Sequence, residues 1–127
     1  MDPISDMLIR IKNAEAAGHA SVRIPYSRIK HEIARVLERA GFAAGLERRG
    51  KRMKKTLEIN LSGRRDAPAI HGIKLFSTPG RRLYRSYREL KRAPHGGIYI
   101  LTTSRGVFSG AEAKREKAGG EIIAEVW

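Results

Sequence analysis

The clearest candidate for chemistry is a short run of hydroxyl side chains that ends in a basic residue and a glycine. Thr102, Thr103 and Ser104 directly follow an apolar stretch in the segment GGIYILTTSRG. Arg105 and Gly106 close that segment. Hydroxyl groups donate and accept hydrogen bonds with little steric bulk, so a rigid row of them can read base edges and 2′-hydroxyl groups. An ordinary polar turn accounts for the same residues, and on physical grounds alone it is the more economical interpretation.

Basic residues are abundant along the whole chain. Lys and Arg number 26 against 13 Asp and Glu, giving a formal net charge of +13, which makes a polyanion the expected partner. Residues 81–92 (RRLYRSYRELKR) place six basic side chains beside two tyrosines that can stack on bases. An equally weighted alternative buries Leu83 and Tyr87 and leaves the arginines solvated. Residues 48–55 (RRGKRMKK) hold six further basic side chains and are expected to form a loop, including Lys54 and Lys55, whose charges are either solvated or paired.

Other kinds of site find little support. The chain has no cysteine, which excludes disulfides, thiolate zinc sites and a cysteine nucleophile. Residues 45–52 resemble a phosphate-binding loop but have Arg52 where Ser or Thr must hold magnesium. The four histidines lie far apart, and no G-x-S-x-G motif supports a catalytic serine. We therefore expect no cofactor, no metal, no small-molecule substrate and no enzymatic activity.

The apolar pattern also argues against a membrane protein. No stretch approaches the roughly 20 apolar residues needed to span a bilayer, and charged residues interrupt the first segment, so it is not a signal peptide. We expect a cytoplasmic protein with no membrane partner.

Two helices and a hairpin are predicted in the first half of the chain. Apolar residues at offsets of three and four indicate a helix that starts at Pro3 and stops near Gly18. A short strand before Pro25 leads to a second helix, capped by Ser27 and ended by Gly41, with Ile33 and Leu37 on its buried side. Alternation from Thr56 to Leu61 predicts a strand, and residues 42–46 are expected to pair with it as a hairpin.

The second half reads mostly as strands. They are expected at residues 70–76, 98–103 and 121–127, with a short helix over 111–117. Ser109 and Glu112 have the spacing of a capping box at the start of that helix. The segment SGRRDAP, residues 62–68, has no apolar periodicity and indicates a boundary, giving an N-terminal lobe of residues 1–66 and a C-terminal lobe of residues 67–127.

Several ordered motifs resemble the family of bacterial small-subunit ribosomal protein number eight. The family's Ser-Thr-Ser-Lys-Gly loop is matched by residues 102–106, and its Gly-Gly-Glu strand by Gly119, Gly120 and Glu121. Similar matches occur at residues 2–8, 24–30 and 79–84, so the resemblance covers nearly the whole chain. Departures are Thr102 and Arg105 within the loop, Thr78 before Pro79, and His95 with Gly96 and Gly97 where a Gly-x-Gly is usual.

The resemblance implies an α+β fold of two small lobes, α-β-α-β-β followed by a mostly β lobe with a short helix. It also implies a structural constituent of the small ribosomal subunit that binds the central domain of its ribosomal RNA directly and early in assembly. Small-subunit protein number five is an implied neighbour, and repression of the protein's own operon is an implied second role. The alternative from a different class is a nucleic-acid packaging protein that has no preferred site.

The resemblance further implies which residues contact RNA. The main contact falls on Thr102, Thr103, Ser104, Arg105 and Gly106, beside Gly119, Gly120 and Glu121. Glu121 is expected to order basic side chains or to accept hydrogen bonds from base amino groups, and Tyr84 is expected to stack, next to Arg82. Pro3, Ser27 and Lys30 are expected to bring the first lobe onto the same RNA. Residues 48–55 are more basic than the family pattern, and from their charge Lys54 and Lys55 are expected to add phosphate contacts.

Overall fold

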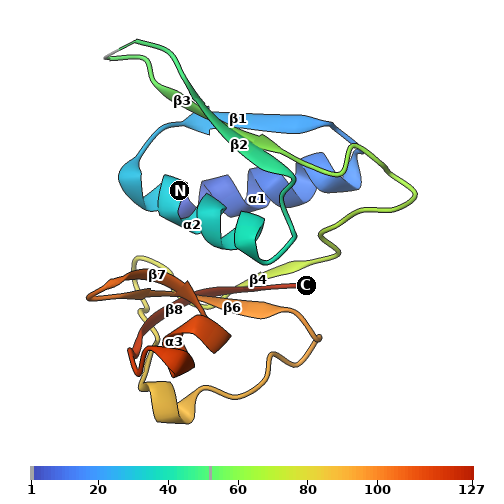
Figure 1. Cartoon of the computed structure of the whole chain (residues 1–127). Helices are drawn as coiled ribbons and strands as arrows, with labels where there is room; N and C mark the ends of the chain where they lie inside the picture. Colours follow the sequence, from blue (N-terminus) through green and yellow to red (C-terminus); the bar gives the residue numbers. More distant parts are fainter. Residues whose placement is uncertain (1, 52) are drawn as a thin grey trace. The chain divides into compact units, whose positions relative to one another are not determined.

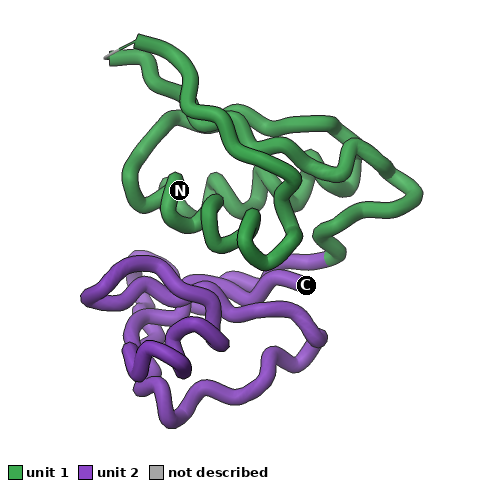
Figure 2. Tube along the Cα trace, viewed as in Figure 1, with its two compact units in different colours: residues 1, 3–71 green, residues 2, 72–127 purple. Residues whose placement is uncertain are grey.

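The computed structural model describes residues 2–51 and 53–127, so Arg52 of the basic segment lies outside the described residues. The chain divides into two compact units, shown in different colours in Figure 2. Unit 1 holds residues 3–71, and unit 2 holds residues 72–127 together with Asp2. Helices and antiparallel sheets occur together in the described residues, which confirms the predicted α+β class.

Unit 1 packs two helices against one face of a three-stranded antiparallel sheet with the strand order β1-β3-β2 (Figure 1). The apolar faces of the helices and the inward positions of β3 form its core, where Leu8, Ile33, Leu37, Leu57 and Ile59 are fully buried. Both predicted helices are confirmed, as is the alternating strand. The elements are α1 (Pro3–Ala16), β1 (Ser21–Pro25), α2 (Arg28–Arg39), β2 (Gly45–Arg49) and β3 (Thr56–Asn60).

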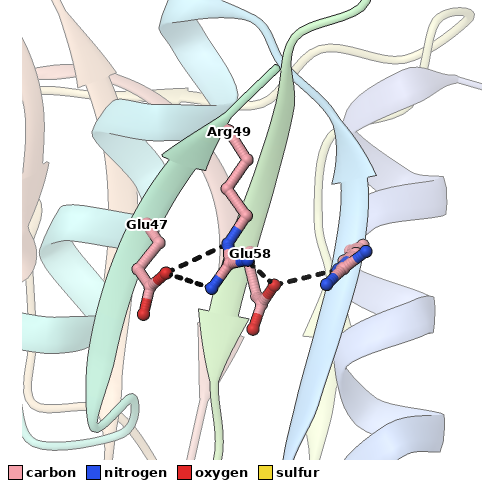
Figure 3. Close-up of polar contacts among 4 residues, drawn as sticks. Glu47, Arg49 and Glu58 are labelled. Atoms are coloured by element: carbon pink, nitrogen blue, oxygen red, sulfur yellow. Dashed lines mark hydrogen bonds and ion pairs between the residues drawn. The ribbon is translucent and has the colours of Figure 1, made fainter.

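The second strand of this sheet lies later in the chain than the sequence indicates. β2 pairs with β3 as expected, but it begins at Gly45 and continues through Arg48 and Arg49, so the expected strand over 42–46 and loop over 48–55 are wrong in their bounds. The reason is electrostatic: Arg49 lies between Glu47, at 2.6 Å, and Glu58, at 3.4 Å (Figure 3). Basic residues of a strand therefore look like residues of a loop when their carboxylate partners are not known.

Unit 1 continues to His71, beyond the boundary after residue 66 that composition indicates. The side chain of Glu15, on α1, is fully buried and holds this segment in place. Its Oε1 accepts hydrogen bonds from the Ser62 hydroxyl at 2.7 Å and from the Ser62 N–H at 3.3 Å. Its Oε2 accepts one from the Ile70 N–H at 2.8 Å. The segment that looks like a linker is thus tied to α1.

Unit 2 is a mostly β structure with one short helix, as expected. Its sheet has the order β4-β8-β6-β7, and β5 also pairs with β8 (Figure 1). The capping box is confirmed, since the Ser109 N–H donates to Glu112 at 2.9 Å and the Glu112 N–H donates to the Ser109 hydroxyl at 3.2 Å. The elements are β4 (Ile73–Leu75), β5 (Tyr84–Arg85), the 3-10 turn η1 (Tyr87–Glu89), β6 (Ile98–Thr103), β7 (Gly106–Ser109), α3 (Gly110–Arg115) and β8 (Gly120–Val126).

Two details of unit 2 differ from the sequence interpretation, and a third concerns the surroundings of His95. The strand expected over 70–76 is shortened to β4, because Ile70 belongs to unit 1. β5 and β7 were not expected, since strands of two and four residues are too short to show a period. At the departure from the family pattern, the ring of His95 stacks on Trp127 at 4.0 Å and its Nδ1 lies 3.0 Å from the buried carboxylate of Glu125.

Candidate nucleic-acid interface

Strand register gathers the predicted residues of the second half at one end of the unit 2 sheet. β8 pairs with β5 on one side and with β6 on the other, which places Glu121 between Tyr84 and Thr102. In the adjacent row, Gly120 lies between Arg85 and Thr103. Directly paired residues on neighbouring strands project to the same face. Three segments that lie far apart in the chain are therefore brought together.

Ser104 and Arg105 form the two-residue turn between β6 and β7, and Thr102 and Thr103 are the last residues of β6. Thr103 pairs with Gly106 at the base of this turn. The Thr103 hydroxyl donates to the Gly106 carbonyl at 2.8 Å and accepts from the Arg105 N–H at 3.1 Å. Gly106 has φ +132°, a backbone conformation that a residue with a Cβ rarely adopts. The Thr103 hydroxyl thus fixes the shape of the turn.

The other two hydroxyl residues differ from Thr103 in their surroundings. Ser104 is exposed at the tip of the turn, and its hydroxyl bonds to no other residue within the described ranges. Thr102 is half-buried in β6, between Val107 and Glu121 of the flanking strands. Of the three, Ser104 is the one best placed to meet a ligand.

The arginine of the turn is oriented by α3. Its guanidinium donates to the backbone carbonyl of Glu116 at 3.0 Å, and it lies 3.6 Å from the Glu116 carboxylate. Glu116 is the C-terminal cap residue of α3, where backbone carbonyls lack helical partners. Arg105 is therefore held in place while its side chain stays exposed.

A second arginine is oriented by the acidic residue of β8. Arg82 lies 3.1 Å from Glu121, whose side chain is only 14% exposed. This contact agrees with one of the two roles expected of Glu121, the ordering of a basic side chain. Tyr84, which pairs with Glu121, is 63% exposed and offers a free ring. We define the sheet-end surface as Arg82, Tyr84, Thr102, Ser104, Arg105 and Glu121.

Gly119, directly before β8, and Gly120, its first residue, have a structural explanation. A Cβ on Gly119 would lie 2.6 Å from the Arg85 carbonyl oxygen, and one on Gly120 would overlap the Thr102 carbonyl oxygen. Both glycines are therefore needed for β5 and β6 to approach β8.

A shallow depression of about 450 Å³ adjoins the sheet-end surface, and part of its lining comes from the basic and aromatic run at residues 81–92. Tyr87 and Arg85 line it together with Tyr84 and the two glycines. Glu89 lies at the same depression, and the Ser86 N–H that donates to it lowers the pKa of its carboxyl below the usual value. Because Glu89 offsets Arg85, the depression suits a base or sugar better than a phosphate.

The residues of unit 1 that were predicted to contact RNA differ from one another in their exposure and in their hydrogen bonds. Pro3 is exposed at the start of α1, but the Ser27 hydroxyl caps α2 by accepting from the Lys30 N–H at 3.2 Å. Lys30 is 9% exposed, and its ammonium group lies 3.4 Å from the Pro25 carbonyl oxygen, to which it donates. Lys54 and Lys55 are exposed in the β2–β3 connection. Ser27 and Lys30 thus have structural roles, whereas Lys54 and Lys55 are open to an approaching polyanion.

No cluster of three His, Asp or Glu side chains suited to a metal ion occurs in residues 2–51 and 53–127. Within the same residues, no helix is both long enough and apolar enough to cross a membrane.

Comparison with known proteins points to one family. The sequence model described as Ribosomal protein S8 matches residues 2–127. The protein named Small ribosomal subunit protein uS8 from Opitutus terrae is 45% identical over 131 residues, covering 99% of this chain and 98% of the relative. Proteins of the same name from Synechococcus elongatus and Sorangium cellulosum are 42% and 45% identical, each over 99% of this chain and at least 97% of the relative.

Proposed function

The chain belongs to the ribosomal protein S8 family, and from this premise we propose that it binds the central domain of small-subunit ribosomal RNA directly, through the sheet-end surface. Family membership makes the chain a structural, non-enzymatic component of the small ribosomal subunit. The step beyond family membership is the direct contact between the sheet-end surface and the ribosomal RNA. RNA is a polyanion, and the net charge of +13 supplies sequence-independent attraction to it.

The observation that carries the proposal is the arrangement of the sheet-end surface. An exposed ring, a free hydroxyl and two arginines lie at one end of a single sheet. Carboxylates and a helix end already hold the arginines, so less side-chain entropy is lost on binding. In the proposed division of labour, arginines and lysines neutralise phosphates, while Ser104 and Tyr84 read base edges and stack.

Family membership supports three further parts of the proposal. The chain binds its RNA early in assembly and helps to fix the fold of the central domain. Small-subunit protein number five is its neighbour. The same surface binds a messenger element that imitates the ribosomal site, through which the protein represses its own operon.

One binding experiment separates sequence-specific contacts from the non-specific electrostatic attraction between the protein and RNA. Ser104→Ala removes a hydroxyl without changing the charge, and should cost about 1–3 kcal/mol on the central-domain RNA because a buried partner on the RNA loses its hydrogen bond. Ser104→Thr retains a hydroxyl and is the matched control. Filter binding to the central-domain RNA of the source organism and to a scrambled RNA of equal length measures both variants. The loss should appear with the cognate RNA alone.

Lys54→Ala with Lys55→Ala provides the contrasting variant. Two exposed charges are removed, so binding to cognate and scrambled RNA should weaken together and depend less steeply on salt. For the unmodified protein, 6 to 10 phosphate contacts predict a loss of roughly 10³ to 10⁵ in affinity between 50 and 200 mM salt. If Ser104→Ala weakens both RNAs equally or neither, the sheet-end surface does not read RNA, and the packaging alternative is favoured.

A further inference from the structure

A second cationic surface lies in unit 1, beside the N-terminal part of α2. We call it the α2 depression: a hollow of about 320 Å³ lined by Tyr26, Arg28, His31, Glu32, Arg35 and Arg48. Three arginines face one glutamate there, which leaves a net charge of +2 when the histidine is neutral. The residues come from β2, from α2 and from the segment before α2, so the fold itself assembles this cluster.

The arginines of the α2 depression differ from those on the outer face of the same sheet. On the outer face, Arg23 lies 2.9 Å from Glu58. Arg49 lies 3.4 Å from the same carboxylate (Figure 3). In the α2 depression, by contrast, Arg28 and Arg35 form no ion pair or side-chain hydrogen bond with any described residue. A need for solubility would not explain why Arg28 and Arg35 lack the carboxylate partners that Arg23 and Arg49 have. Uncompensated like charges repel one another, and a bound anion would remove that repulsion.

The third arginine is fixed in position by an aromatic residue. The guanidinium of Arg48 lies 5.1 Å from the centre of the Tyr26 ring, and one of its nitrogens donates to the Tyr26 hydroxyl at 3.3 Å. The edge of His31 meets the same ring, with centroids 5.6 Å apart and planes at 67°. Tyr26 thus orders both a guanidinium and an imidazole around the hollow.

The electrostatic state of His31 agrees with a positive field in the α2 depression. Burial lowers the pKa of its imidazole below the usual value, and the charges of Arg35 and Arg48 lower it further, against smaller opposing effects of Glu32 and Glu38. The part of this shift that comes from Arg35 and Arg48 reflects the excess of positive charge around the ring, while burial makes the larger part.

We propose that the α2 depression binds a phosphate group of the RNA backbone, as a contact separate from the sheet-end surface; this inference rests on the proposed RNA-binding function. Guanidinium groups suit phosphate because their planar fork donates two parallel hydrogen bonds to it. An acidic protein segment has similar charge but would not account for the chain-wide excess of 26 basic over 13 acidic residues. RNA is therefore the occupant that the charges favour.

The first test measures salt dependence. Arg28→Gln with Arg35→Gln should remove this one phosphate contact, so the loss of affinity between 50 and 200 mM salt should be about 3.5-fold smaller than for the unmodified protein. Lys12→Gln with Arg65→Gln is the matched control, since both residues are exposed in unit 1 and the change in charge is equal. Urea melts of both double variants check that folding is intact. An equal change in the control variant would overturn the proposal, because the effect would then come from overall charge.

The second test reports on the α2 depression directly. The His31 ring is titrated by NMR in the free protein, with the central-domain RNA fragment, and with polyglutamate. RNA should raise the pKa of His31, because a phosphate beside the ring favours the imidazolium form. If polyglutamate raises it and RNA does not, an acidic protein segment occupies the hollow and the phosphate proposal is wrong.

These outcomes are distinguishable from a failure of the proposed function. Equal affinity for cognate and scrambled RNA would reject specific reading by the sheet-end surface. Phosphate binding in the α2 depression would still appear with either RNA, in the salt dependence and in the pKa of His31.

Discussion

Replacing the buried carboxylate of Glu15 by an amide should destabilise unit 1 by about 1–3 kcal/mol. Oε1 of Glu15 accepts from the Ser62 hydroxyl and N–H, and Oε2 accepts from the Ile70 N–H. In Glu15→Gln, one of these oxygens becomes an NH₂ group. Whichever way the amide is oriented, two donors face each other, and either the Ser62 N–H or the Ile70 N–H loses its acceptor. The estimate is the cost of one buried donor without a partner, to which the loss of charge-assisted hydrogen bonds adds.

Two measurements check this prediction. Urea denaturation gives the change in the free energy of unfolding, with Glu38→Gln as a control because Glu38 is exposed on α2, where a surface change is expected to cost less than about 0.5 kcal/mol. Hydrogen exchange of the Ile70 amide reports on the contact itself, since this amide should be protected in the unmodified protein and exchange faster in Glu15→Gln. If the variant retains full stability and Ile70 stays protected, Glu15 does not anchor the segment before unit 2 and our account of the unit boundary is wrong.

Three further predictions concern packing and titration. Gly120→Ala should cost about 1–3 kcal/mol in urea melts and weaken RNA binding, because its Cβ would overlap the Thr102 carbonyl oxygen, whereas Gly80→Ala, with open space around it, should be neutral; equal effects would refute the packing argument. Leu37→Ala should cost about 2–5 kcal/mol because Leu37 is fully buried, and a variant as stable as the unmodified protein would show that the side chain does not pack in the core. Burial holds the pKa of His31 below 6.5, so the unfolded chain binds this proton more readily and stability should fall as the pH drops through 6.5; melts at several pH values should show a smaller fall for His31→Gln.

Helices and the alternating strand could be predicted because their signals are local. The Ser27 cap, the apolar spacing of α1 and the Ser109–Glu112 capping box all lie within a few residues of the elements that they define. Glu15 shows where local reasoning ends. It lies on the apolar face of α1, and its partners Ser62 and Ile70 are 47 and 55 positions away. Neither its burial nor the true boundary of unit 1 could be inferred without the tertiary contact.

The sequence could indicate which residues make up the candidate site, but it could not indicate the role of each one. The motif located Thr103 and Ser104, but only the geometry shows that Thr103 braces the turn and that Ser104 is free. The family resemblance implied that Lys30 helps to bring the first lobe onto the RNA, yet its ammonium group donates to the backbone of β1. A sequence gives the charge of a side chain, whereas its availability depends on neighbours from other segments.

β8 pairs with β4, β5 and β6, and it follows all three in the chain. Unit 1 is complete once His71 has been synthesised, so it can fold while the rest of the chain is still being made. Until residues 120–126 are added, the strands that β8 joins have no central partner, and Tyr84 has no strand to place it beside Thr102. A nascent chain halted before β8 therefore has a finished first unit but no sheet-end surface, which delays the proposed RNA contact until synthesis has passed that strand.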